Sequence, residues 1–362
     1  MTTTVLGAGY AGIMAANRLA GHGEEVALVT PHPWFVERIR LHTVASGGRT
    51  DARRDLATLL HPAVAVVTDT VTRIDENTLE LRSGASLPYE TLVYAVGSGA
   101  EAASGAYRVA SETDAVRLRA ALRSRPDARV TVVGAGLTGI EIAAALREAG
   151  RRVRVVTAAE PHRRAARAQL QHLHTTGVEV VTGCRVDVAQ TAGEEITVDA
   201  TGFVVPSLAA DSGLPTDARG RLLVDETLTV PGRPRIIGAG DAVRIDADTA
   251  AHLRPACATA LPMGANAADV VLARREGMPG EPFALGYTAQ CVDLAGGRGH
   301  VQFVHPDDSE RSLALTGRTG GLFKEAVCRL TVRWLAQERQ RAGRYSWPAG
   351  PARAVPAGFR AQ

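Results

Sequence analysis

The sequence predicts an α/β protein in which one parallel-sheet domain is inserted into another and a small α+β domain follows at the C-terminal end. Three observations lead to this prediction. An apolar run, a glycine-rich turn and an alanine-rich helix follow one another in residues 2–20, and the same order returns in residues 130–150. A third segment, residues 229–241, is extended and ends in Gly-Ala-Gly-Asp. Two strand–turn–helix units in one chain are far more specific than one.

The first unit starts with the apolar run Thr2 to Leu6 and ends with a predicted helix over Ile13 to Ala20. The turn between them consists of Gly7, Ala8, Gly9, Tyr10, Ala11 and Gly12. Gly7 permits a tight turn, Gly9 leaves room for a pyrophosphate against bare backbone, and Gly12 lets helix and strand pack closely. The helix N-terminus faces the phosphates. A dinucleotide is therefore the natural ligand, although such a turn is also a plain packing device.

The second unit repeats this order, with a strand over Val130 to Val133 and a helix over Ile140 to Ala149. Its turn consists of Gly134, Ala135, Gly136, Leu137, Thr138 and Gly139. Both units have the Rossmann-type pattern, so we expect the chain to bind two dinucleotides.

The second strand of each unit ends in a threonine, Thr30 in the first and Thr157 in the second. Rossmann-type domains usually have Asp or Glu there to bind the ribose hydroxyls, and a threonine hydroxyl makes a weaker contact. Beyond Thr157, Arg163 and Arg164 slightly favour the 2′-phosphate of NADPH, whereas Glu160 suits the ribose of NADH. A charged helix face explains the same arginines equally well.

Residues 31–111 are predicted to follow the first unit as a partly irregular segment. Arg38 and Arg40 are expected either to meet a phosphate or a cofactor ring or to form a solvated basic turn. Tyr89 to Gly97 is predicted as a buried strand whose last glycine lets backbone approach a ligand. A small antiparallel meander is expected from four short runs, over residues 64–67, 71–74, 79–81 and 85–87. The Gly-, Ala- and Ser-rich residues 98–111 predict a linker.

The later part of the chain adds one more ligand signal. Asp241, just beyond the extended segment that starts at Thr229, can accept hydrogen bonds from a polyol such as a ribityl chain. A helix over residues 261–273 would aim its first N–H groups, near Ala260, at an anion or an electron-rich ring edge. Residues 287–304 predict a hairpin. The amphipathic, basic helix expected over residues 322–335 docks on the protein's own body or, as the alternative, on a membrane surface.

Composition excludes several classes of function. The net charge of +3 is small and no block of like charges is present, so nucleic acid is not an expected partner. Lys324 is the only lysine, which removes Schiff-base and P-loop chemistry from most of the chain. The four cysteines have neither C-x-x-C nor metal-ligand spacing, so we expect reduced thiols and no metal. Without a signal peptide or an apolar run of spanning length, the expected location is the cytoplasm.

The order of these motifs resembles that of the two-dinucleotide-binding-domain flavoproteins, the FAD- and NAD(P)H-dependent oxidoreductases. Within them it is similar to the type II NADH:quinone dehydrogenases and the apoptosis-inducing-factor-like proteins. The resemblance covers essentially the whole chain and implies FAD as cofactor, with NADPH or NADH as electron donor. It implies FAD contacts from Gly7, Gly9, Tyr10, Ala11, Gly12, Thr30, Arg40, Val71, Ala95, Gly97, Gly240, Asp241 and Ala260. It implies NAD(P)H contacts from Gly134, Gly136, Leu137, Thr138, Gly139, Thr157 and Arg163.

Glu141 follows the second glycine turn, at the position where family members have a glutamate beside the stacked nicotinamide and flavin. The resemblance therefore makes Glu141 the predicted catalytic residue, although an acid in a first helical turn is also favourable for electrostatic reasons alone.

Three departures from the family pattern qualify the resemblance. Thr30 replaces the acid expected to bind the FAD ribose. The paired cysteines of the disulfide reductases are absent, which argues against disulfide substrates. Several relatives pair a lysine with the glutamate beside the flavin, whereas the sole lysine here lies in the predicted C-terminal helix.

These observations predict an enzyme that passes hydride from NAD(P)H to FAD and then electrons to a quinone or another flat small molecule. The acceptor face is expected near Trp34, Phe35 and Gln290. The alternatives are a flavin-dependent tailoring enzyme of a biosynthetic pathway and a non-catalytic nucleotide-binding scaffold that has lost FAD. The expected domains are residues 1–108 with 217–280 for FAD, 109–216 for NAD(P)H and 281–362 at the C-terminal end. Homodimer formation and peripheral membrane contact are left open.

Overall fold

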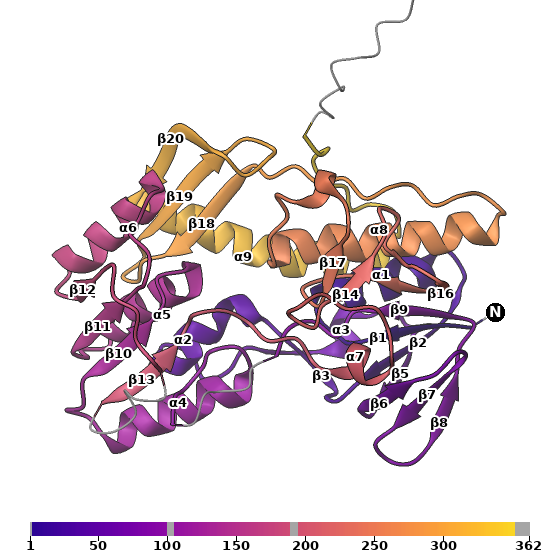
Figure 1. Cartoon of the computed structure of the whole chain (residues 1–362), viewed down its shortest axis with the longest axis horizontal. Coiled ribbons are helices and arrows are strands. Elements are labelled where there is room, and N and C mark those ends of the chain that lie inside the picture. Colours follow the sequence, from indigo (N-terminus) through magenta and orange to yellow (C-terminus); the bar gives the residue numbers. More distant parts are fainter. Residues whose placement is uncertain (1, 100–104, 189–194, 352–362) are drawn as a thin grey trace, which may run out of the picture.

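The computed structural model describes residues 2–99, 105–188 and 195–351. It has two lobes, each built on a parallel sheet, with a small antiparallel sheet and a long helix joining them (Figure 1). The sheet of the first lobe has the strand order β15-β16-β9-β1-β2-β5. Its strands are β1 (Thr2–Leu6), β2 (Glu25–Thr30), β5 (Ala65–Thr68), β9 (Thr91–Tyr94), β15 (Thr229–Val230) and β16 (Arg233–Gly238). All neighbours pair in parallel except β15, which is antiparallel to β16.

Helices α1 (Tyr10–Gly21) and α8 (Cys257–Arg275) pack together against the first sheet. Their close approach depends on one small residue. A Cβ added to Gly264 in α8 would lie 2.2 Å from the carbonyl oxygen of Ala11, so a larger residue there would push the two helices apart. This packing brings the start of α8 beside the first glycine turn.

The second lobe contains the sheet β12-β11-β10-β13, in which all strands are parallel. Its strands are β10 (Val130–Val133), β11 (Val153–Val156), β12 (Glu179–Val181) and β13 (Ile196–Asp199), and its helices are α4 (Glu112–Ser124), α5 (Leu137–Glu148) and α6 (Arg164–Thr175). In sequence, this lobe lies between β9 and β15 of the first sheet. The predicted insertion of one Rossmann-type unit into another is therefore confirmed.

The predicted four-run meander is wrong in one strand. β6 (Val71–Ile74), β7 (Thr78–Leu81) and β8 (Ser86–Pro88) form the expected antiparallel sheet. The first run, β5, instead pairs in parallel with β2 at the edge of the main sheet. A four-residue apolar run carries no signal for which sheet it joins, because pairing is decided by contacts distant in sequence.

Several short elements fill the connections. They are β3 (Trp34–Val36), η1 (Arg38–Arg40), α2 (Leu41–Ser46), β4 (Arg53–Asp55), α3 (Leu56–Leu59), α7 (Leu208–Asp211), β14 (Leu222–Val224), β17 (Val243–Ile245) and η2 (Asp248–Ala250). Helix α2 has a positional role, because its buried residues Leu41 and Val44 belong to the hydrophobic core of the second lobe. Helix α2 thus packs against the second lobe, although it precedes all strands of that lobe in the sequence. Of the predicted linker over residues 98–111, residues 100–104 lie outside the described residues.

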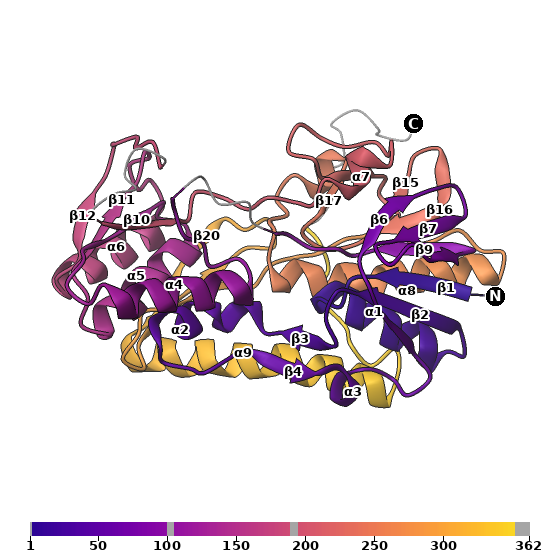
Figure 2. The same ribbon diagram turned by 90° about the horizontal axis from the view of Figure 1, so that it is seen from below.

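The C-terminal part contains the antiparallel strands β18 (Ala289–Asp293), β19 (Gly299–Val304) and β20 (Glu310–Thr316), followed by α9 (Gly317–Gln340). The hairpin β18–β19 confirms the prediction. β20 was not predicted, since its side chains are mostly exposed and show no apolar alternation. Figure 2 shows α9 running along one side of the molecule beneath both lobes. The helix therefore docks on the protein's own body.

The end of α9 is locked to the first lobe by a buried ion pair. Arg18 Nε of α1 lies 2.6 Å from Glu338 Oε1, and the two side chains are 4% and 0% exposed. Glu338 also accepts backbone N–H groups from Gly343 and Tyr345, so the segment after the helix folds back over α1. Within the described residues, no helix combines the length and the apolar character needed to cross a membrane.

Candidate dinucleotide-binding and active site

The first glycine turn has the geometry of a pyrophosphate cradle. A Cβ on Gly12 would lie 1.8 Å from the carbonyl oxygen of Gly7, and one on Gly7 would lie 2.4 Å from that of Ala95, so both positions require glycine. Gly9, in contrast, has no described atom within 4 Å of its Cβ position. Gly9 is also the N-cap of α1, and no side chain caps the first N–H groups of this helix. An open surface with uncapped N–H groups suits a phosphate.

The second glycine turn repeats this design at the carboxyl end of β10. A Cβ on Gly139 would lie 2.0 Å from Gly134 O, and one on Gly134 would lie 2.6 Å from Ala200 O. The space beside Gly136 is open, and α5 starts at Leu137 and Thr138 without a side-chain cap. Each turn therefore contains two glycines that are required by close packing and one glycine that leaves room for a ligand.

Asp241, shortly after the end of β16, has a carboxylate oxygen with no partner in the part of the chain that the structure describes. Its Oδ1 is buried with no hydrogen bond among the described residues, while its Oδ2 accepts a hydrogen bond from Ser98 Oγ at 3.1 Å. Arg38 donates to the carbonyl oxygen of Ser98 at 2.6 Å. A buried carboxylate oxygen without a donor is costly, so the free Oδ1 suits the hydroxyl of a bound polyol. The glycine cradle and this oxygen together fit FAD.

The other predicted FAD contacts differ in burial and in their partners. Tyr10 is buried edge-on against Phe35, with ring centroids 5.0 Å apart, and burial raises its pKa well above the usual value. Thr30 Oγ1 donates to the carbonyl oxygen of His32 at 3.2 Å. The neighbouring positions are Ala11, Val71, Ala95 and Ala260, all buried, and Gly97 and Gly240, both with positive φ. Their contacts with FAD remain predictions.

Arg40 is engaged by a partner from the C-terminal helix. Its Nη2 lies 2.9 Å from Glu325 Oε1, and its Nε lies 3.8 Å from Glu37 Oε2. The predicted acceptor-face residues also have different partners. Trp34 stacks on His32 and lies under Arg53, whereas Gln290 donates to Asp308 at 2.8 Å. A shared acceptor face for Trp34 and Gln290 remains a prediction.

The residues predicted to select the nicotinamide cofactor lie at the edge of the second sheet. Thr157 follows β11, and Glu160 accepts a hydrogen bond from Thr182 Oγ1 at 2.8 Å. Arg163 is the N-cap of α6, and its side chain is 40% exposed. It donates to the carbonyl oxygen of Asp308, in the turn between β19 and β20, at 3.3 Å, and its Nη1 lies 3.8 Å from Asp308 Oδ2. The guanidinium is thus partly accessible and is held by Asp308.

Glu141 and Lys324 form an ion pair, which corrects the third departure from the family pattern. Lys324 Nζ lies 2.7 Å from Glu141 Oε1, and the side chains are 12% and 11% exposed. Burial alone would lower the pKa of Lys324, but the facing carboxylate raises it, so the lysine stays protonated. The sequence position of Lys324 suggested that this pairing was lost. The fold restores it, because α9 passes beneath the start of α5.

Three thiols lie near this ion pair. Cys257 begins α8, Cys291 lies in β18 and Cys328 lies in α9, and the charge of Lys324 acts on all three. All four cysteines are free. Burial raises the pKa of Cys257 to about 11 and that of Cys328 to about 12, so these thiols stay protonated. The charge of Asp241 also raises the pKa of Cys257.

Two residues that the sequence did not single out complete the cluster around Glu141. His42 of α2 lies with Nδ1 3.8 Å from Glu141 Oε2 and with Nε2 3.3 Å from Asp293 Oδ2. The backbone N–H of Asp293 donates to Glu141 Oε1 at 3.0 Å. No local pattern marks these residues, since they come from separate elements and converge only in the folded chain.

One parallel-sheet unit is inserted into another, and each unit has a glycine cradle. Together with the free oxygen of Asp241, these features define a flavoprotein with two dinucleotide sites. Comparison with known proteins agrees. Residues 1–268 match the family described as pyridine nucleotide-disulphide oxidoreductase, so the chain belongs to that family. It is an FAD-dependent NAD(P)H oxidoreductase.

Individual relatives extend over nearly the whole chain. An NADH dehydrogenase-like protein of Mycobacterium tuberculosis is 29% identical over 377 aligned positions, covering 89% of this chain and 92% of the relative. The sulfide:quinone oxidoreductase of Aquifex aeolicus has a TM-score of 0.77 at 17% identity, with 93% and 92% of the two chains covered. NDH2 of Plasmodium falciparum, solved with NADH, has a TM-score of 0.77 at 15% identity, with 93% and 96% covered. These two structures share the fold.

Proposed function

We propose that this protein passes electrons from NAD(P)H through bound FAD to a flat small-molecule acceptor, such as a quinone, that reaches the flavin directly. The observation that carries the proposal is the pair of glycine turns, each with one open glycine beside an uncapped helix start. Asp241 Oδ1, which has no partner among the described residues, adds a hydrogen-bond acceptor suited to the hydroxyl groups of the ribityl chain. FAD, when bound, supplies the ring that takes hydride from the nicotinamide and hands electrons onward.

The residues of the chain would bind the two cofactors, orient them and shield their junction from water. The turn around Gly9 and Asp241 would hold FAD, and the turn around Gly136 would hold NAD(P)H. Glu141 would stand beside the nicotinamide as the catalytic residue, with Lys324 as its ion-pair partner. Because both side chains are nearly buried, water would have little access to their junction.

The thiols support direct contact between acceptor and flavin. A thiol relay needs a reactive thiolate, and such thiolates have lowered pKa values. Burial raises the pKa of Cys257, Cys291 and Cys328 instead, and none of the cysteines is paired in a disulfide. An acceptor of the disulfide kind would lack its usual chemical partner, whereas a quinone needs none.

Absorbance spectroscopy tests the proposal. The purified protein should show flavin bands that NADH or NADPH bleaches without oxygen, and a soluble quinone should restore them faster than a disulfide such as oxidised glutathione. A colourless protein that added FAD does not reconstitute would overturn the flavin part. Equal reoxidation by the disulfide would overturn the proposed acceptor class.

A further inference from the structure

A line of alternating acid and base side chains runs from the surface to Glu141. Asp293 Oδ2 lies 3.3 Å from His42 Nε2, His42 Nδ1 lies 3.8 Å from Glu141 Oε2, and Glu141 Oε1 lies 2.7 Å from Lys324 Nζ. The four residues come from β18, α2, α5 and α9. The imidazole thus bridges two carboxylates through its two nitrogens.

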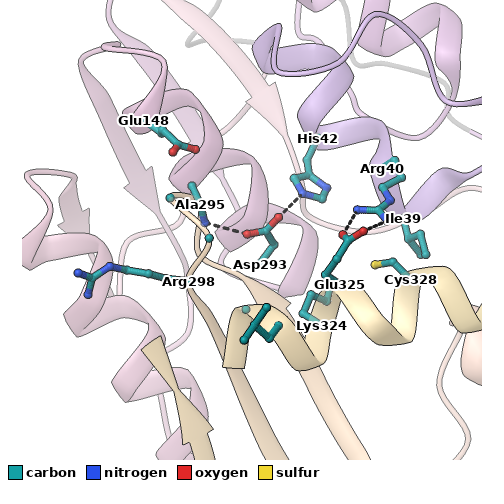
Figure 3. Close-up of a pocket in the computed structure, with 14 residues that line it drawn as sticks. Ile39, Arg40, His42, Glu148, Asp293, Ala295, Arg298, Lys324, Glu325 and Cys328 are labelled. Atoms are coloured by element: carbon teal, nitrogen blue, oxygen red, sulfur yellow. Dashed lines mark hydrogen bonds and ion pairs between the residues drawn. The ribbon is translucent and has the colours of Figure 1, made fainter. Parts of the chain in front are cut away.

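Asp293, His42 and Lys324 line a cavity of about 390 Å³. Figure 3 shows Asp293 and His42 facing each other on its wall, with Arg40 and Glu325 on the same side of the cavity. The side chain of Asp293 is 31% exposed, whereas His42 is 5% and Glu141 is 11% exposed. The carboxylate of Asp293 is thus in contact with solvent, whereas His42 and Glu141 are both largely shielded from it.

Hydrogen bonds hold the carboxylate of Asp293 in place and favour its ionised form. The Ala295 N–H donates to Asp293 Oδ1 at 2.9 Å. Burial opposes ionisation of Asp293, but hydrogen bonds from His42 and Ala295 outweigh it and lower its pKa. His42 contacts two charged groups, Asp293 on β18 and Glu141 on α5. The other charged residues that line the same cavity are Lys324 and Glu325 on α9, Arg40 on η1, Glu148 on α5 and Arg298 in the β18–β19 turn. An imidazole held between two carboxylates can take a proton on one nitrogen and release one from the other.

We propose that Asp293, His42 and Glu141 form a proton relay that carries a solvent proton from this cavity to the reaction site. The inference rests on the proposed function and deepens it. Reduction of a quinone-type acceptor by NAD(P)H consumes one solvent proton: acceptor, NAD(P)H and H⁺ give the two-hydrogen reduced acceptor and NAD(P)⁺. Hydride brings both electrons and one hydrogen, and the relay supplies the other hydrogen as a proton.

The transfer proceeds in two steps. A proton from water in the cavity passes through Asp293 Oδ2 to His42 Nε2, and the proton on His42 Nδ1 passes to Glu141 Oε2. Glu141 then gives its proton to the reduced acceptor, and His42 returns to its first tautomer. The 3.8 Å step is longer than a hydrogen bond, so Glu141 or one water must close it; catalytic hydrogen bonds are often long before the substrates bind. Lys324 remains protonated throughout as the counter-charge of Glu141.

The first experiment uses His42→Gln, since an amide fills similar space but does not relay protons. Holoenzyme reduced with NADH is mixed with a soluble quinone in weak buffer containing a pH-indicator dye. Wild-type protein should take up a proton at the rate of flavin reoxidation. In His42→Gln both rates should fall about tenfold or more, and added imidazole should partly restore them. Flavin content and reduction by NADH should stay unchanged.

Two matched controls separate the relay from general damage. Glu148→Gln removes a carboxylate that lines the same cavity on α5, and His22→Gln removes an imidazole that contacts the Arg18 carbonyl at the end of α1. Both should retain wild-type proton uptake. If His42→Gln matches these controls, the relay is wrong even though the flavin is reduced normally. If the wild type has no reducible flavin, the proposed function itself fails.

A spectroscopic readout is independent of turnover. In oxidised protein labelled with ¹⁵N-histidine, Asp293→Asn should move the ring nitrogen signal of His42 Nε2, because the charged oxygen 3.3 Å from this nitrogen is lost. Glu148→Gln should move it much less. His42 signals that Asp293→Asn leaves unmoved would contradict the contact on which the relay depends.

Discussion

Lys324 Nζ lies 2.7 Å from Glu141 Oε1, and this ion pair joins α9 to α5. The contact links the C-terminal helix to the helix that follows the second glycine turn, and through Glu141 to His42 and Asp293. The sole lysine of the chain therefore pairs with Glu141, although it lies near the far end of the sequence.

Lys324→Met should destabilise the protein by about 3–5 kcal/mol, because Glu141 would be left as a buried charge without its partner. Denaturant unfolding of the purified variant measures the loss. The double variant Lys324→Met with Glu141→Leu should recover much of it, since an apolar pair of similar volume removes the unpaired charge. A single variant as stable as the wild type would show that the pair contributes little.

Alanine at the two open glycines should separate the two nucleotide sites. Neither Gly9→Ala nor Gly136→Ala meets a described atom within 4 Å, so both cofactor-free proteins should keep wild-type thermal stability. Gly9→Ala should lower FAD content sharply. Gly136→Ala should keep FAD and raise the KM for NAD(P)H. If the two substitutions had the same effect, the assignment of one turn to each cofactor would be wrong.

Asp241→Ala should weaken FAD retention while folding stays intact, because the substitution removes the buried oxygen that lacks a partner. A lost hydrogen bond to a charged group corresponds to FAD binding about tenfold weaker, or more. Flavin absorbance after gel filtration measures it. Asp246→Ala, at an exposed carboxylate nearby, serves as the control and should retain flavin. Wild-type FAD content in Asp241→Ala would remove this residue from the site.

Glu325 should make stability depend on pH in the acid range. Its hydrogen bond from Arg40 lowers its pKa from the usual 4.5 to about 2. A lowered folded-state pKa stabilises the protein above the unfolded-state pKa, and this contribution is lost as the pH falls from about 4.5 towards 2. The stability difference between wild type and Glu325→Gln should therefore be largest above pH 5 and shrink on acidification. A pH-independent difference would contradict the ion pair.

Arg163→Ala tests the choice of nicotinamide cofactor. If the exposed guanidinium binds the 2′-phosphate of NADPH, the KM for NADPH should rise about tenfold and that for NADH should change little. Steady-state kinetics with both donors measures the ratio, and Arg167→Ala, on the same helix, is the control. Equal effects on both donors would assign Arg163 to its contact with Asp308 instead.

Local sequence was sufficient for the elements that depend on near neighbours. The two strand–turn–helix units, the extended segment before Asp241 and the C-terminal hairpin and helix could all be predicted, because glycine spacing and apolar periodicity act over a few residues. The insertion of one unit into the other also followed from the order of these motifs.

What the sequence by itself determined is thus the fold class, the family and the two glycine cradles. Only the tertiary structure decided that β5 joins the main sheet, that Glu325 pairs with Arg40 and that Lys324 pairs with Glu141. The same holds for His42 and Asp293, whose meeting depends on α2 packing against the second lobe. These contacts join residues far apart in the chain. Their partners are chosen by how whole elements pack, which no short window of sequence records.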